Sequence, residues 1–319
     1  MKWRKIGQIF DPASHRLPNG CTQFAQSPQT LVFEDFVRIY FSTRSVDPKN
    51  GKYLSHIAFV DMRKNLRDII AVSDQTVIPL GELGCFDEHG IFPINVVRDG
   101  GRILAYTTGW NRRVSVSVDT GIGLVTSENN GRTFQRAGHG PVLSASLHEP
   151  CLVGDGFVKI IDSIYHMWYI FGTGWKRFAP DAAPDRTYKI AHATSTDGVE
   201  WQKQDATQII ADRLGPDESQ ALPTVVGIGD HHHMFFCYRE SFDFRSAKGR
   251  GYRIGHAWSD DLKSWTRDDE NPALAGTPGE WDSDMQCYPH VFECDGSVYL
   301  LYNGNEFGRA GFGLALLER

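Results

Sequence analysis

The sequence has few features of membrane, nucleic-acid or redox proteins. No apolar run approaches the roughly 20 residues that cross a bilayer, and the N-terminal MKWRKIGQIF contains no apolar stretch typical of a signal peptide. No block of Lys or Arg stands out and the net charge is −6, which argues against a nucleic-acid partner. The six cysteines include no CxxC pair, a distribution that favours reduced core residues over disulfides or a zinc site. We therefore expect a cytoplasmic protein with no membrane span and no metal.

What the sequence does contain is a repeat. Five similar segments each carry a proline near the start of an apolar stretch, and an aromatic strand such as RILAYTTGW or HHMFFCYR follows. The prolines, at spacings of 65, 57, 73 and 66 residues, are Pro28, Pro93, Pro150, Pro223 and Pro289. Self-similarity of this length is typical of arrays of supersecondary units that bury their faces against each other. It predicts an all-β fold, a five-bladed β-propeller with four-stranded antiparallel blades.

The repeat also predicts the domain organisation. We expect one domain over residues 1–319, with blades at about 22–82, 83–146, 147–212, 213–276 and 277–319. The last repeat ends after three strands, and residues 1–10 have the character of the missing outer one, so an N-terminal strand is expected to close the ring. Turns that begin at Ser127, Ser195 and Ser259 recur between the third and fourth strands. Their Ser and Asp or Asn side chains suit a structural role, since they can bond their own backbone.

Acidic residues precede or begin the inner strand in four of the five repeats. They are Asp87 and Glu88, Glu149, Asp217 and Glu218, and Asp282 and Asp284. Inner strands of a propeller line a central channel, so these carboxylates are expected to converge on it. Paired carboxylates with divergent pKa values carry out glycoside hydrolysis. The alternative is that some of them are structural hydrogen-bond acceptors.

On these residues the chain resembles the five-bladed β-propeller glycosidases, the superfamily of glycoside hydrolase families 32, 43, 62 and 68 and their mannoside-phosphorylase relatives. The resemblance implies that Glu149, in HEP, is the general acid and that Asp87, in FDEHGIFP, tunes it. The sequence departs from the family in the first repeat, where Gln26-Ser27-Pro28 replaces an expected Asp. Glu218 or Asp284 could then supply the base. Asp11, in IFDP, is a weaker candidate because it lies near the closing strand.

Other polar and aromatic residues are candidates for binding substrate at the same channel mouth. Arg239 and Arg253 could hold a carboxylate or phosphate through their planar guanidinium groups, and Trp110 and Trp175 could stack on sugar rings. The full set of predicted substrate-binding residues is Gln26, Glu88, His89, Trp110, Trp175, Arg239, Arg253, Asp282, Tyr288, Asn303 and Asn305. No organic cofactor is implied.

The resulting hypothesis is a carbohydrate-active enzyme, glycoside hydrolase-like, that acts on a glycosidic bond of an oligosaccharide, nucleotide sugar or other small molecule. Two alternatives remain open. One is a propeller that binds a sugar or glycoconjugate without cleaving it, and the other is a phosphorylase or transferase with an arginine anion clamp. A sialidase-like six-bladed propeller is less favoured, because the repeat count is five and the sequence makes no arginine triad evident.

Overall fold

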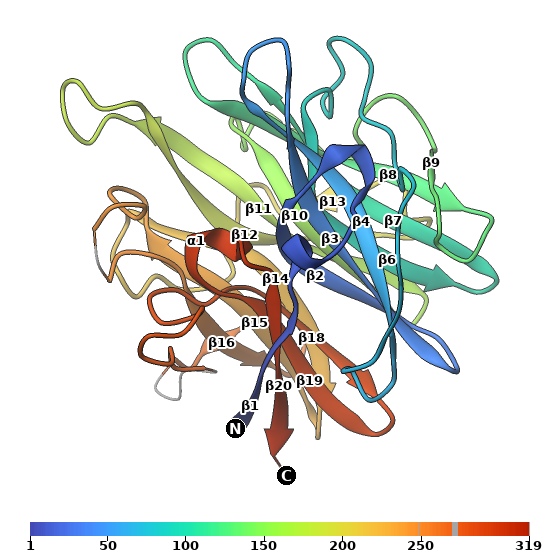
Figure 1. The fold of residues 1–319 in the computed structure, drawn as a ribbon. Coiled ribbons are helices and arrows are strands. Elements are labelled where there is room, and N and C mark those ends of the chain that lie inside the picture. Colours follow the sequence, from blue (N-terminus) through green and yellow to red (C-terminus); the bar gives the residue numbers. More distant parts are fainter. Residues whose placement is uncertain (248, 270–273, 319) are drawn as a thin grey trace.

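The computed structural model describes residues 1–247, 249–269 and 274–318 (Figure 1). The fold is all-β, with the helical elements limited within these residues to the 3-10 turns η1 (Pro12–Ser14) and η2 (Pro18–Gly20) and the short helix α1 (Asn305–Gly308). No described helix has the length and apolar character to span a bilayer.

Three four-stranded antiparallel sheets come from the C-terminal half of the chain and the N-terminal strand. The first contains β10 (Val153–Ile161), β11 (Ile164–Lys176), β12 (Asp185–Ser195) and β13 (Gln202–Lys203). The second contains β14 (Glu218–Ile228), β15 (His231–Glu240), β16 (Arg253–Ser259) and β17 (Thr266–Arg267). The third contains β18 (Cys287–Cys294), β19 (Ser297–Asn303), β20 (Phe312–Glu318) and β1 (Lys2–Phe10).

The N-terminal half forms an eight-stranded sheet made of two antiparallel groups. The first group is β2 (Gln23–Val32), β3 (Phe36–Val46), β4 (Tyr53–Arg63) and β5 (Ile69–Val72). The second group is β6 (Gly90–Asp99), β7 (Arg102–Arg112), β8 (Val118–Ser127) and β9 (Gln135–Arg136). A single parallel pair, Ser55 opposite Gly90, joins β4 to β6.

The N-terminal strand β1 completes the sheet of the C-terminal strands. It pairs antiparallel with β20, from Lys2 opposite Glu318 to Phe10 opposite Phe312, where the sequence led us to expect the outer strand of the last repeat. The two termini consequently lie close together, as Figure 1 shows at the ends of β1 and β20. The pairing covers an edge of β20 that would otherwise be open to other strands.

Alternate side chains of a strand point to opposite sides of its sheet, and in β11 both sets are buried. In β11, Met167 and Tyr169 enter an apolar cluster with Leu104 of β7. Trp168 and Ile170, on the other face, enter a different cluster that contains residues of β14 and β15. The sheet that contains β11 therefore packs against neighbouring sheets through both of its faces.

The serine turns have the structural role predicted for them. The hydroxyl of Ser195 accepts the N–H of Gly198, and that of Ser259 accepts the N–H of Leu262. Asp261 accepts the N–H groups of Lys263 and Ser264, which lowers the pKa of its carboxyl to about 2. These acidic residues close turns at the surface.

Candidate functional site

A β-bulge occurs at the same point of each inner strand, β2, β6, β10, β14 and β18. The pairing with the next strand slips between Ile91 and Ile94, for example, and between Gly154 and Phe157. The residues at the bulges are Ser27, Phe92, Asp155, Leu222 and Tyr288. Bulges re-aim side chains and are common beside functional sites.

The bulges correct the alignment of the third repeat. A proline follows the bulged residue in four strands, but Gly156 takes that place in β10. Pro150, which we expected to be the repeat's proline, lies before β10 begins. With Gly156 in its place the spacings become 65, 63, 67 and 66 residues, a more regular period. Asp155 is therefore the third repeat's counterpart of Ser27 and Tyr288.

The backbone is strained at these positions. Ser27, Asp155, Leu222 and Tyr288 have φ values of 52°, 53°, 49° and 55°, in the left-handed region that favours glycine. Such conformations cost on the order of 1–3 kcal/mol for other residues and collect at functional sites, where surrounding structure enforces them. The strain is repeated in four sheets where their inner strands bulge.

A cavity of about 320 Å³ lies where several of the sheets meet, and three of the bulged residues, Phe92, Asp155 and Tyr288, line it. Its wall is rich in rings, contributed by Tyr53, Phe92, Trp110, Tyr188, Phe244, Tyr252, Tyr288 and Phe307. It also contains the arginines Arg44, Arg186, Arg239 and Arg245. Among the described lining residues Asp155 is the one carboxylate. The volume is at the low end of the range of about 300–1,000 Å³ that is usual for small-ligand sites.

Asp155 is held so that one carboxylate oxygen remains available. Its backbone N–H donates to Thr108 Oγ1 at 2.7 Å, and its Oδ2 accepts the N–H of Leu222 at 3.3 Å. No hydrogen bond from a described residue reaches Oδ1. Burial raises the pKa of this carboxyl from 3.8 to about 7, against the opposing effects of the Leu222 hydrogen bond and of Arg186. The group is therefore partly protonated near neutral pH.

The four carboxylates that matched in sequence do not line this cavity. Glu149, fully buried, forms an ion pair with Lys203 of β13 at 2.5 Å and accepts the hydroxyl of Tyr169 at 2.6 Å. Asp87 pairs with Arg136 of β9. In both cases the acid precedes the inner strand and the cation comes from the outermost strand of the same group.

The same arrangement recurs in the next two sheets. Glu218 pairs with Arg267 of β17 at 2.7 Å, and Asp282 pairs with Lys5 of β1. Burial alone would raise the pKa of Asp282, but the Lys5 contact and two further hydrogen bonds lower it. These pairs tie the inner end of each sheet to its outer strand, which is the structural alternative considered for the matched acids. Asp284 is exposed, and its N–H donates to Asn305 Oδ1 at 2.8 Å.

The predicted substrate-binding residues divide into two groups. Trp110, Arg239 and Tyr288 line the cavity. The others are not part of its lining, namely Gln26, Glu88, His89, Trp175, Arg253, Asp282, Asn303 and Asn305. Gln26 lies near it, because its amide donates to the carbonyl of the lining residue Phe307 at 2.5 Å. Asn303 joins the loops structurally, since it accepts the N–H of Ser27 and donates to Ala25 and Gly311.

Several lining residues escaped the sequence analysis. The alignment of the repeats on Pro150 did not single out Asp155, although its segment GDGF falls at the regular period of the repeat. Arg44, Arg186 and Arg245 come from β3, β12 and the loop after β15, so no motif connects them. Among the described residues, no group of three His, Cys, Asp or Glu side chains is placed to hold a metal ion.

Comparison with known proteins identifies relatives along the whole chain. Uncharacterized protein MT1551 of Mycobacterium tuberculosis strain CDC 1551 / Oshkosh is 35% identical over 319 residues, covering 100% of both chains. Uncharacterized protein Rv1502 of strain ATCC 25618 / H37Rv is similar to the same extent, 35% over 319 residues and 100% of both chains. The chain belongs to the family of these two mycobacterial proteins. No family model matches it.

Solved structures show the wider fold. A glycoside hydrolase superposes with a TM-score of 0.75 at 16% identity, over 99% of this chain and 91% of that one. A second structure comes from work on the mannoside phosphorylase family GH130, described as containing glycoside hydrolases that target β-1,2 mannosidic linkages in Candida mannan. It has a TM-score of 0.69 at 13% identity and covers 99% and 93% of the two chains. The protein therefore has the fold of the propeller glycosidases.

Proposed function

We propose that this protein is a carbohydrate-active enzyme that acts on a glycosidic bond in the central cavity, with Asp155 as the proton donor. The observation that carries the proposal is the position of one buried carboxyl, with a raised pKa, in a cavity walled by aromatic rings. A proton donor is most effective when its pKa lies near the working pH, and the pKa of Asp155 is about 7. Aromatic faces such as that of Trp110 suit the apolar faces of a sugar ring.

The fold supports the placement of this cavity at the centre of the molecule. We read the two groups of the eight-stranded sheet as separate blades, which makes five blades with the three four-stranded sheets. Their inner strands would then surround the cavity, with one bulge from each strand near it. The glycoside hydrolases among the structural neighbours support the carbohydrate chemistry.

The proposal differs from ordinary glycosidases in the attacking group. Those enzymes use a second carboxylate as base or nucleophile, and no second carboxylate lines the cavity among the described residues. We therefore place the attacking oxygen on the substrate or on an acceptor, with Asp155 protonating the leaving oxygen. As the glycosidic bond breaks and the attacking oxygen bonds to the anomeric carbon, the attacking hydroxyl loses its proton to solvent, and the Asp155 carboxylate takes up a proton from solvent when the product leaves.

Turnover of a panel of methyl glycosides and disaccharides, whose leaving oxygens need a proton, by Asp155→Asn tests the assignment. Asn keeps the acceptor for the Leu222 N–H but has no acidic proton to donate, so turnover should fall by about 10²–10⁴-fold while sugar binding persists. Asp230→Asn, at an exposed position between β14 and β15, is the matched control and should retain activity. Full activity of Asp155→Asn would refute the proposal.

Glu149→Gln separates this proposal from the prediction made from sequence. We expect it to lower stability, because Lys203 loses its partner, and to leave turnover per folded molecule largely intact. A stable but inactive Glu149→Gln would return the acid role to Glu149. Sugar binding by the wild type without turnover of any glycoside or transfer to any acceptor would assign the cavity to a binding protein.

A further inference from the structure

The cavity contains arginine side chains that the protein does not neutralise. Two arginines of the described chain are among its largest fully buried side chains, and they make a direct comparison. Arg38 donates two hydrogen bonds of 2.7 Å to the carboxylate of Asp61. Arg239, also 1% exposed, has no described carboxylate oxygen within 4.0 Å. It donates to the hydroxyl of Tyr188 and the carbonyl of Glu240, and its Nε has no partner.

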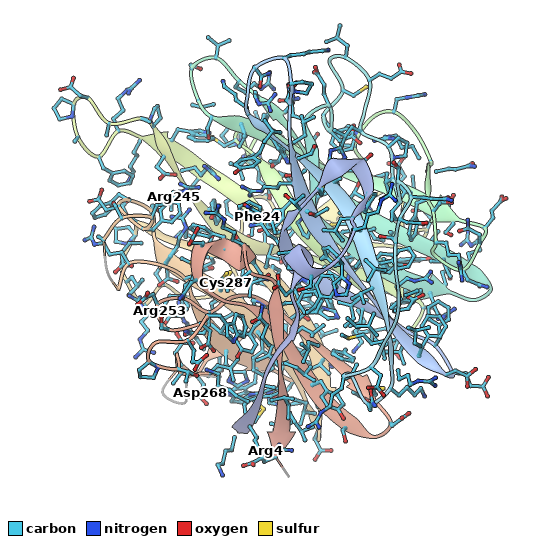
Figure 2. The ribbon with its side chains drawn as sticks, viewed as in Figure 1. Arg4, Phe24, Arg245, Arg253, Asp268 and Cys287 are labelled. Carbon is cyan, nitrogen blue, oxygen red and sulfur yellow. The ribbon has the colours of Figure 1, made fainter. Side chains whose placement is uncertain are left out.

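Two of the other three arginines also lack an ion pair with any described carboxylate. Arg44 makes no ion pair or side-chain hydrogen bond within the part of the chain described, and its buried Nε is also without a partner. Arg245, labelled in Figure 2, likewise has no ion pair to a described residue. Arg186 is the exception, with Asp185 at 3.7 Å. Arg239 is buried, whereas Arg44 is partly buried and Arg245 is exposed. A buried charge without a partner is costly, so a structural role alone explains Arg239 poorly.

Aromatic rings orient the guanidinium groups without cancelling their charge. Arg239 and Arg245 lie over the ring of Phe244, at 3.4 Å and 4.3 Å from its centroid. Arg44 lies 4.7 Å from the centroid of Phe24 and 5.6 Å from that of Tyr53. Such stacking fixes the plane of a guanidinium and leaves its N–H groups free for a ligand. The arrangement is therefore ready to receive a planar or tetrahedral oxyanion.

The arginines also repel one another. Desolvation lowers the pKa of Arg245, and the neighbouring charges of Arg186 and Arg239 lower it further, against the opposing effects of Asp185 and Tyr288. Desolvation also lowers the pKa of Arg44, and Arg245 adds to this, against the opposing effects of Tyr288 and Tyr53. An anion among them would relieve both effects, whereas a neutral sugar would relieve neither.

We propose that the ligand of this cavity is a sugar that carries an oxyanion group, a uronate or a sugar phosphate, bound through Arg239 together with Arg44 and Arg245. The inference rests on the proposed function for the claim that the ligand is a sugar. The charged and aromatic residues line the same small cavity, so a ligand that fills it meets both. A free inorganic anion would satisfy the arginines and leave the rings without a partner.

Ligand binding to the inactive Asp155→Asn variant tests this inference separately from catalysis. The probes are glucuronate, galacturonate, glucose 6-phosphate, their neutral parents glucose and galactose, and inorganic phosphate. Their binding is measured by calorimetry and thermal shift. We expect at least one acidic sugar to bind ten times or more tighter than its parent and than phosphate. Arg239→Met should remove that preference, and Arg44→Met provides a second test if the first variant does not fold. Arg102→Met, whose arginine lies outside the cavity lining and pairs with Asp99, should keep it.

The outcomes separate the two proposals. Equal binding of acidic and neutral sugars, no binding of any acidic probe, or an unchanged preference in Arg239→Met would overturn the inference. Phosphate that binds as tightly as the acidic sugars would refute the claim that the bound oxyanion is part of a sugar. An Asp155→Asn variant that still turns over glycosides would refute the catalytic role and leave the arginine result standing.

Discussion

Replacing Asp155 by asparagine should make the protein more stable, by an amount that increases with pH. The folded state holds this carboxyl at a pKa of about 7, whereas the ordinary value is 3.8. A raised carboxyl pKa means that the native state binds the proton more tightly than the unfolded state does. Ionisation therefore costs stability as the pH rises from 3.8 to 7. Asparagine removes this cost and has nearly the same shape.

The size of the effect follows from the two pKa values. With 3.8 for the unfolded and about 7 for the folded state, linkage puts the cost of ionisable Asp155 at about 2 kcal/mol at pH 5 and about 4 kcal/mol at pH 8. The free energy of unfolding of Asp155→Asn should exceed that of the wild type by a margin that widens by about 2–3 kcal/mol over this interval. All other titrating groups are common to the two proteins and cancel in the difference.

Urea unfolding at pH 5, 6, 7 and 8 measures the margin, provided that the two proteins have equal slopes against denaturant. Asp284→Asn is the control, and its curve should run parallel to that of the wild type. Parallel curves for Asp155→Asn as well would show that the Asp155 carboxyl titrates normally. The argument that it donates a proton near neutral pH would then fail.

Four further predictions concern the rest of the structure. Lys203→Met leaves the buried Glu149 carboxylate without its ion-pair partner. Urea unfolding should then show a loss of about 3–5 kcal/mol in the free energy of unfolding. A loss below 1 kcal/mol would contradict a structural role for the pair. Trp110→Ala should weaken sugar binding in calorimetry without changing the melting temperature by more than a few degrees, and unchanged affinity would remove the ring from the site. Burial lowers the pKa of His290 from 6.5 to about 3, so the wild type should lose stability as the pH falls from 6.5 towards 3. His290→Asn should flatten this part of the stability curve, and an equally steep curve would refute the prediction. Deleting residues 2–10 should expose the edge of β20 and give aggregated protein in light scattering, and a monodisperse product would contradict the edge argument.

The strands were predictable because each repeat has the same order of proline, aromatic strand and third segment. The pairing of β1 with β20 followed from counting strands in the last repeat. The register within a strand was harder, since Pro150 lies close to the inner strand of its repeat and concealed the equivalence of Gly156 with the other prolines. Only the hydrogen-bonded register of the bulge distinguishes the two positions.

The site was less predictable than the fold because the interacting residues lie far apart in the sequence. Asp87 and Arg136 are 49 residues apart, and Glu149 and Lys203 are 54 apart. Nothing local in the sequence shows that these acids already have partners, so their regular spacing resembled a convergent catalytic set. The cavity arginines, in contrast to these acids, have no ion-pair partners, and this lack is visible only when the sheets are assembled. A matched acid and a matched cation in one repeat should be considered as a possible ion pair first.

The pairing of β1 with β20 also has a consequence for biosynthesis. Residues 2–10 are made before the other strands and their partners at 312–318 after them, so β1 has no neighbour until β20 has been synthesised. Domains usually begin to fold during synthesis from the N-terminal side, and here the sheet of β1 and β18–β20 must wait for β20. A chain stopped near residue 300 would lack β20, with β1 and the open edge of β19 unpaired. Truncated products should therefore depend on chaperones, and a circular permutant that joins residues 318 and 2 should be relieved of this delay.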